Sequence, residues 1–262
     1  MKHLLSFIIL ILSPLIMSAS GDTLKTESSS IKRWSITASV GYGFPFSKQV
    51  IGGVGTVDGN SNIKSKLVIG TFGKGVFSFV AVGYKINEHF GSEFGIHSTW
   101  GTEMVTSKVT DLSTGYVFLE KSIQVSTNGM FAGFFMTDTY SKFHISLHND
   151  LLIGILNTAT EETFSNGVKP TWKYSGRISY GWLSRIGGSY DISEKINIGL
   201  IGFFLMHSWS PAKGETLNGQ NTIVFTDTPS SNGFYTLPGN QYARVTYPLH
   251  AAGVNVFIGY VF

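Results

Sequence analysis

Apolar and polar residues alternate strictly near both ends of the sequence. From Trp34 to Phe44 every second residue is apolar or aromatic, and the residues between them are Ser, Thr or Gly. The same period returns in Val254, Val256, Ile258, Tyr260 and Phe262. Because successive side chains of a strand point to opposite faces, both segments predict β-strands with one apolar face. Aromatic residues at the ends of such a face are typical of strands that cross an outer membrane.

Six further strands are expected between these two, at Gly75–Ile86, Phe90–Gly101, Ile123–Thr137, Phe143–Leu156, Trp172–Tyr190 and Ile196–Trp209. Short joints at 87–89, 138–142 and 191–195 alternate with long connections at about 45–74, 102–122, 157–171 and 210–242. Short periplasmic turns, long extracellular loops and an even strand number are typical of transmembrane barrels. In hydrocarbon an open sheet edge is too costly, so the sheet must close.

The predicted fold is therefore all-β, a closed antiparallel transmembrane β-barrel of eight strands spanning 33–262. A ten-stranded barrel is the alternative, in which the apolar segment from Tyr116 to Leu119 helps to split the 102–122 connection into two more strands.

The N-terminal segment 1–20 has the pattern of a cleaved signal peptide. Leu4 to Met17 is almost wholly apolar, and Ser18, Ala19 and Ser20 are the small residues that a signal peptidase needs. An uncleaved anchor helix is the alternative, but the apolar run is shorter than the ~20 residues that span a bilayer. The polar segment 21–32 is expected to be a periplasmic tail, and the localisation is the cell outer membrane.

Composition narrows the function. Charged residues make up 13% of the chain, about half the usual share of a soluble protein. The absence of cysteine excludes disulfides and Cys-ligated zinc. A net charge of +3 without a basic run does not suit nucleic acid. His144 and His148 would lie about 13 Å apart along a strand, too far for one metal ion. We therefore expect no metal and no cofactor.

The alternation also sorts the polar residues of the strands. It places a polar network inside the barrel, made of Glu93, His97, His144, His148, Asp150, Arg177 and Arg185. Asn197 and His207 also face inward, whereas Phe77 and Phe79 cannot be assigned. An eight-stranded barrel is just wide enough for side chains to fill, and buried charges must be paired. The network is interpreted as a plug of ion pairs, with a narrow pore or proton path as the alternative.

One motif suggests catalysis. His144-Ile145-Ser146 is similar to the His-x-Ser motif of lipid A deacylases, which are eight-stranded barrels. The asparagine-rich continuation of that motif is absent, and the alternation turns His144 and Ser146 toward the lumen and away from lipid. We therefore predict that the protein is not an enzyme. The aromatic residues of the 210–242 loop, Phe225, Phe234 and Tyr235, either contact sugars or proteins or pack on the barrel rim.

Residues 33–262 resemble the small outer-membrane β-barrel proteins related to OmpX, OmpW and the OmpA barrel, including the Bacteroidetes-type barrel domain. Phe262, with Tyr260 and Ile258 before it, resembles the C-terminal signal read by the barrel-assembly machinery. The resemblance implies a monomer in contact with lipid and lipopolysaccharide, with a possible extracellular ligand at the loops. The leading hypothesis is a non-enzymatic barrel that displays loops for surface interaction or envelope integrity. A narrow passive channel and a lipid A-modifying enzyme are the alternatives.

Overall fold

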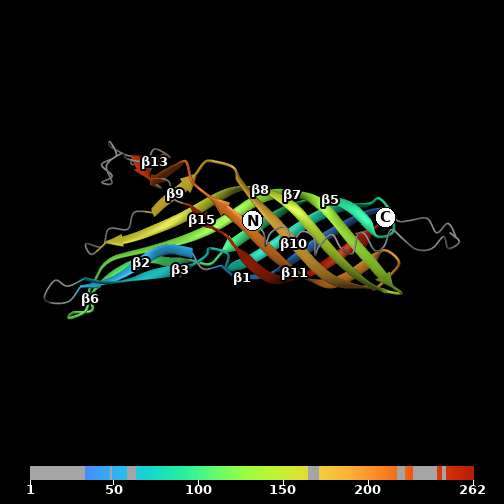
Figure 1. Ribbon diagram of the computed structural model, residues 1–262, viewed down its shortest axis with the longest axis horizontal. Helices are drawn as coiled ribbons and strands as arrows, with labels where there is room; N and C mark the ends of the chain where they lie inside the picture. The colour runs from blue at the N-terminus through green and yellow to red at the C-terminus, as the bar shows by residue number, and fades with distance from the viewer. Residues whose placement is uncertain are drawn as a thin grey trace, which may run out of the picture. The chain divides into compact units, whose positions relative to one another are not determined.

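The computed structural model describes residues 33–47, 49–57, 63–164, 171–216, 222–226, 241–243 and 246–262 (Figure 1). They belong to one compact unit that runs from Lys32 to Phe262. The predicted signal peptide and periplasmic tail lie outside the described residues, as do Phe234 and Tyr235 of the fourth loop. Within the described ranges, no helix is long and apolar enough to cross a membrane.

Eight antiparallel strands pair in a closed ring. In ring order they are β1 (Trp34–Pro45), β4 (Gly75–Lys85), β5 (Phe90–Gly101), β7 (Val117–Tyr140), β8 (Phe143–Phe164), β10 (Ser179–Asp191), β11 (Ile196–Trp209) and β16 (Ala251–Val261). The ring closes because β1 pairs with β4 on one side and with β16 on the other. The predicted antiparallel barrel of eight strands is confirmed.

The ring strands expose an apolar outer face. Phe94, Ile96 and Trp100 of β5 are more than half exposed, and so are Val254, Val256 and Ile258 of β16. Alternating residues of the same strands are buried inside the ring, among them Glu93 and His97. A large apolar surface on a sheet without an edge matches hydrocarbon and not water. The chain is therefore an integral barrel of the outer-membrane type.

Aromatic residues surround the ring at the end where its turns are short. Trp34, Tyr140, Tyr190 and Phe262 are all more than half exposed there. The turn 86–89 is closed by Asn87, whose Oδ1 accepts hydrogen bonds from the amides of His89 and Phe90. Ser193 does the same in the turn 192–195, where its Oγ accepts from the amides of Lys195 and Ile196. This end carries the predicted short periplasmic turns.

The four long connections are not simple loops. Six of the eight strands that the structure describes outside the ring make up a sheet extension that continues β7 and β8 beyond the ring. They are β2 (Gln49–Val57), β3 (Ile63–Gly70), β6 (Met104–Asp111), β9 (Thr171–Ser175), β12 (Lys213–Thr216) and β13 (Thr222–Thr226). Two short strands complete the set, β14 (Gln241–Ala243) on β13 and β15 (Tyr247–Pro248) on β11. β7 and β8 can carry the extension because they are 24 and 22 residues long (Figure 1).

The expected boundaries of two strands and the ten-stranded alternative need correction. β7 begins at Val117 and β8 ends at Phe164, so both are longer than the alternation predicted. Residues 104–111 and 117–122 do form strands, as the ten-stranded alternative required, but β6 lies outside the ring. The reason is that these segments pair above the apolar belt, where strands need not close on themselves.

The expectation of one strand over Trp172–Tyr190 is wrong. The chain bends between β9 and β10, where Gly176 and Arg177 adopt positive φ angles of 86° and 58°. Such left-handed residues interrupt the alternation of a strand. Tyr174, expected on the lipid-facing side, is consequently 4% exposed and belongs to a buried cluster.

Candidate functional site

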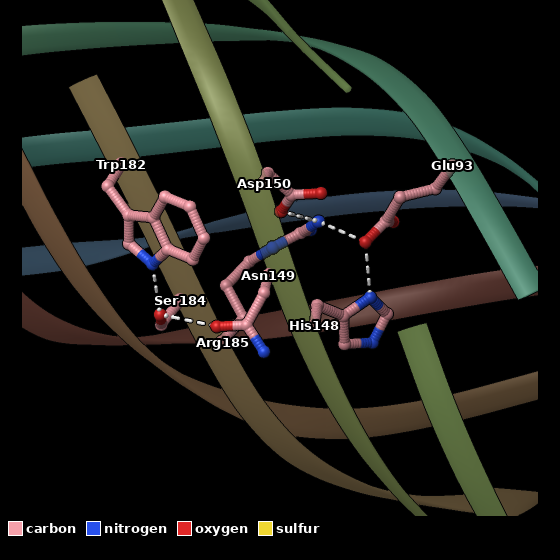
Figure 2. A network of polar contacts seen from close by, with 7 residues as sticks. All are labelled: Glu93, His148, Asn149, Asp150, Trp182, Ser184 and Arg185. Atoms are coloured by element: carbon pink, nitrogen blue, oxygen red, sulfur yellow. Dashed lines mark hydrogen bonds and ion pairs between the residues drawn. The ribbon is translucent and has the colours of Figure 1, made fainter. Parts of the chain in front are cut away.

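A cluster of charged residues from β5, β8 and β10 is buried inside the ring, and Figure 2 shows its contacts. Arg185 of β10 donates from one nitrogen, Nη2, to Glu93 Oε1 of β5 at 2.7 Å and to Asp150 Oδ2 of β8 at 2.8 Å. His148 Nδ1, also on β8, bonds to the same Glu93 oxygen. Asp150 is fully buried and Arg185 is 4% exposed. Four of the seven residues predicted for the lumen network therefore meet.

Aromatic rings enclose the guanidinium of Arg185. Its carbon lies 4.8 Å from the centre of the Phe131 ring and 5.7 Å from that of Phe79, which is cation–π distance. Phe77 and Phe79, which the alternation could not assign, are both buried in the apolar lumen core with Phe203 and Leu205. The cation is thus surrounded by carboxylates and aromatic faces in place of water.

A glycine makes room for this cluster. A Cβ built on Gly133 of β7 would stand 2.1 Å from the carbonyl oxygen of Asn149 and 2.5 Å from Asp150 Oδ1. Any side chain there would displace the carboxylate that Arg185 binds. The close approach of β7 and β8 at this level therefore depends on glycine.

Two histidines from opposite walls form a second polar layer. His97 of β5 and His207 of β11 are both almost fully buried, and their ring centroids lie 6.3 Å apart. Ser179 donates its single proton to the carbonyl of Gly154, at 2.8 Å, so it accepts from His207 Nε2 at 2.7 Å. This assignment fixes the tautomer and leaves His207 Nδ1 as an acceptor. That nitrogen and both nitrogens of His97 have no partner among the described residues.

The other two predicted network residues lie away from the central cluster. His144 is at the periplasmic end of β8, where Nε2 bonds to Asp191 at 2.8 Å and Nδ1 to Thr139 at 2.9 Å. Its neighbour Ser146 is not its partner. Arg177 lies in the bend between β9 and β10, so its predicted inward direction, which assumed one continuous strand, does not apply.

Above the ring, a second core fills the space under the sheet extension. It consists of buried residues from six separate segments, namely Phe72, Ile123, Val125, Tyr174, Trp209, Phe225, Tyr247 and Leu249. We call these residues the extracellular core. Trp209 Nε1 donates to the carbonyls of Gly176 and Arg177, which ties β11 to the bend. Between this core and the lumen core lies a cavity of about 10 Å³, lined by Phe72, Phe77, Thr127 and Leu249 among others. It has room for no more than about one water.

A polar cluster on the lipid-facing side was missed by the sequence analysis. Trp182 Nε1 donates to Ser184 Oγ, which donates to Asn149 Oδ1, both at 2.8 Å (Figure 2). Ser184 and Asn149 are directly opposite each other on β10 and β8. The sequence did contain a signal for this cluster, because Asn149 interrupts the apolar series of Leu147, Leu151 and Ile153 on β8.

A third polar group lies at the outer rim of the ring. His250 Nδ1 is 2.9 Å from Ser47 Oγ, and its Nε2 is 3.4 Å from Ser208 Oγ. Burial lowers the pKa of His250, so the imidazole is neutral at pH 7. Ser47 and His250 are far apart in sequence, and only closure of the ring brings them together. The neutral ring here bridges two serines and has no carboxylate partner among the described contacts, unlike the base of a catalytic triad.

Two other features named from the sequence are a metal site, which is not expected, and the C-terminal assembly signal. Within the part of the chain that the structure describes, no group of three or more His, Asp or Glu residues could hold a metal ion. Ile258 and Tyr260 lie on the exposed face of β16, and the amide of Phe262 donates to the carbonyl of Trp34 at 2.9 Å. These contacts fit the closed ring and do not test recognition by an assembly machine.

Comparisons with known proteins give structural neighbours only. No family model matches the sequence, and no curated protein does. Neisserial surface protein A is 10% identical, with 87% of this chain and 97% of that chain covered and a TM-score of 0.40. Ail, the attachment invasion locus protein of Yersinia pestis, is 10% identical, with 88% and 99% covered and a TM-score of 0.36. The outer membrane protease OmpT from Escherichia coli is 9% identical, with 93% and 100% covered and a TM-score of 0.38.

These neighbours are outer-membrane β-barrel proteins, as the resemblance seen in the sequence suggested. At such low TM-scores they carry no information about the activity of this chain. The barrel fold rests on the ring of strand pairs.

Proposed function

We propose that this protein is a sealed, non-enzymatic barrel that holds a folded recognition surface above the outer membrane. The observation that carries the proposal is the extracellular core. Connections that served only to link strands would have no reason to share a buried core with the strand ends, yet eight residues from six segments are buried here, Trp209 at 2% exposure among them. A core of this kind fixes the shape of the sheet above it, and rigid shape is what a recognition surface requires.

The seal is supported by two successive layers. Phe79 and Phe131 close around the Arg185 cluster inside the ring, and the extracellular core covers the outer mouth. The cavity between them is too small for a solute. A narrow passive channel would need a continuous polar path, and the aromatic residues of both layers interrupt one.

The edge strand of the sheet extension carries exposed charged residues. β3 ends the sheet on one side and carries Lys64 and Lys66, both exposed. Charged residues, lysine above all, protect an edge strand against pairing with another chain. The surface offered for recognition is therefore the face of the extension and not its edge.

Conductance tests the seal. The protein in a planar bilayer should give no discrete openings at voltages where an open porin conducts. Discrete openings from the unaltered protein would overturn the proposal in favour of a channel.

Accessibility tests the display. The chain has no cysteine, so single cysteines report unambiguously. A membrane-impermeant maleimide should label Ser65→Cys on β3 in intact cells, and Glu88→Cys in the turn 86–89 only after the cells are opened. The reverse pattern would place the extension in the periplasm and exclude a surface role. Lipid A that changes in mass with expression of the unaltered protein, but not of Ser47→Ala, would show an enzyme instead.

A further inference from the structure

The lipid-facing cluster contains hydrogen-bond donors that the barrel itself does not satisfy. The indole N–H of Trp182 can only donate, so Ser184 Oγ accepts this hydrogen bond. The Ser184 hydroxyl in turn donates a hydrogen bond to Asn149 Oδ1. The structure places Asn149 Oδ1 toward Ser184, and Figure 2 shows the amide nitrogen turned away from Ser184. Among the described residues Asn149 Nδ2 has no acceptor, and Oδ1 keeps a second lone pair.

The depth of Asn149 determines which acceptors can reach it. Asn149 lies six residues along β8 from Phe143, at the periplasmic aromatic belt. At 3.3 Å per residue and a tilt near 40°, this is about 15 Å into an apolar band about 25 Å tall. Ser184 lies six residues from Tyr190 on β10 and gives the same depth. Lipid ester oxygens are at the edges of that band, roughly 10 Å away. An unsatisfied amide N–H in hydrocarbon is costly, so its acceptor must come from protein.

We propose that a second copy of this chain supplies the acceptor, so that two barrels associate through the β8–β10 wall with their Asn149 amides paired. A two-fold axis along the membrane normal places both copies at the same depth. Each Nδ2 then donates one N–H to the free lone pair of the other Oδ1, so that two hydrogen bonds pair the two amides. Polar contacts between transmembrane helices show that such hydrogen bonds, although weak, favour the association of two chains in a membrane.

The other lipid-facing asparagine explains why depth matters. Asn128 of β7 likewise accepts from a serine, with Ser98 Oγ at 2.7 Å. Ser98 lies two residues from Trp100, in the outer aromatic belt, where headgroups and water can satisfy a free amide. Asn128 is therefore a matched control with the same chemistry at a harmless depth.

Energy transfer in vesicles measures the association. Protein labelled at Glu88→Cys with donor or acceptor dye is reconstituted in phosphatidylcholine–phosphatidylglycerol vesicles over a range of protein-to-lipid ratios. Transfer should exceed the level for random encounters. Asn149→Leu should weaken dimerisation about fivefold to tenfold, as expected for two hydrogen bonds of modest strength, and Asn128→Leu should not. Both variants should keep the normal heat-dependent gel mobility, because leucine suits a lipid-facing position.

Cross-linking tests the geometry without relying on the hydrogen bonds. Asn149→Cys should form disulfide-linked dimers in the membrane, whereas Val40→Cys, equally lipid-facing on the opposite wall at β1, should not. Three outcomes would each overturn the pairing of two copies. The first is random transfer for the unaltered chain, and the second is equal cross-linking at both positions. The third is a carbonyl-bearing lipid that co-purifies with the monomer and is lost in Asn149→Leu. None of these outcomes depends on whether the extracellular sheet is a recognition surface.

Discussion

The lumen core and the extracellular core solve the same packing problem with different chemistry. Both bury aromatic rings, but the lumen core also encloses Arg185, Glu93 and Asp150, whereas the extracellular core is held by apolar contacts and by bonds such as Trp209 Nε1 to main-chain carbonyls. The ring fixes eight walls around a narrow space, so side chains with opposite charges can meet across it. The loops must hold their own position, and apolar packing does this without a geometric match. Charge is therefore used where the backbone is already fixed.

The largest expected effect is in the lumen. Arg185→Met leaves Glu93 and Asp150 close together and without the guanidinium that binds both, and the loss of one member of a buried ionic cluster costs about 3–5 kcal/mol. The free energy of unfolding in urea, followed by the heat-dependent gel shift in detergent, measures it. Adding Glu93→Gln and Asp150→Asn removes the uncompensated charges and should recover most of the loss. If the single variant were as stable as the unaltered protein, ion pairing would not stabilise the lumen.

The sequence predicted the lumen better than the extracellular core, and the reason is the period of the pattern. Glu93, Asp150 and Arg185 lie on strands that alternate strictly, so counting by two places them inside. Phe77 and Phe79 alternate with valines, and two apolar series on one strand give no preferred face. Their burial follows from packing against Phe131 and Phe203 across the ring.

The extracellular core has no such period to read. Its residues come from short strands, bends and connections, and Tyr174 shows how the rule fails where the chain turns at Gly176. The pairing of Asn149 with Ser184 was hidden for a different reason. A single polar residue in an apolar series can be assigned a partner only when the register of the neighbouring strand is known.

A local effect, confined to the sheet extension, is expected in the extracellular core. Trp209→Ala removes a ring that is 2% exposed and two hydrogen bonds to the bend, a loss of about 3–5 kcal/mol to local packing. Because this core lies outside the apolar belt, the ring should stay folded and keep its gel mobility. Proteolysis and amide hydrogen exchange should show the sheet extension opening. Trp100→Ala, at a lipid-facing tryptophan that is 55% exposed, is the control and should leave the extension closed. Loss of the gel shift in Trp209→Ala would mean that the two cores unfold together.

The smallest expected effect comes from an exposed ion pair. It tests whether burial or the separation of the charges determines the contribution of an ion pair. Lys213 Nζ and Glu215 Oε1 lie 2.7 Å apart, the same separation as Arg185 Nη2 and Glu93 Oε1, but both side chains are about half exposed. Exposed pairs gain little because water screens the charges and two long side chains must be ordered. Lys213→Ala should therefore leave the urea midpoint unchanged within error, at low salt and at high salt alike. Arg185→Met should stay destabilised under both conditions, because ions do not reach a buried cluster. A salt-dependent loss in Lys213→Ala that approached the loss in Arg185→Met would show that the separation of the charges, and not their burial, determines the contribution of an ion pair in this barrel.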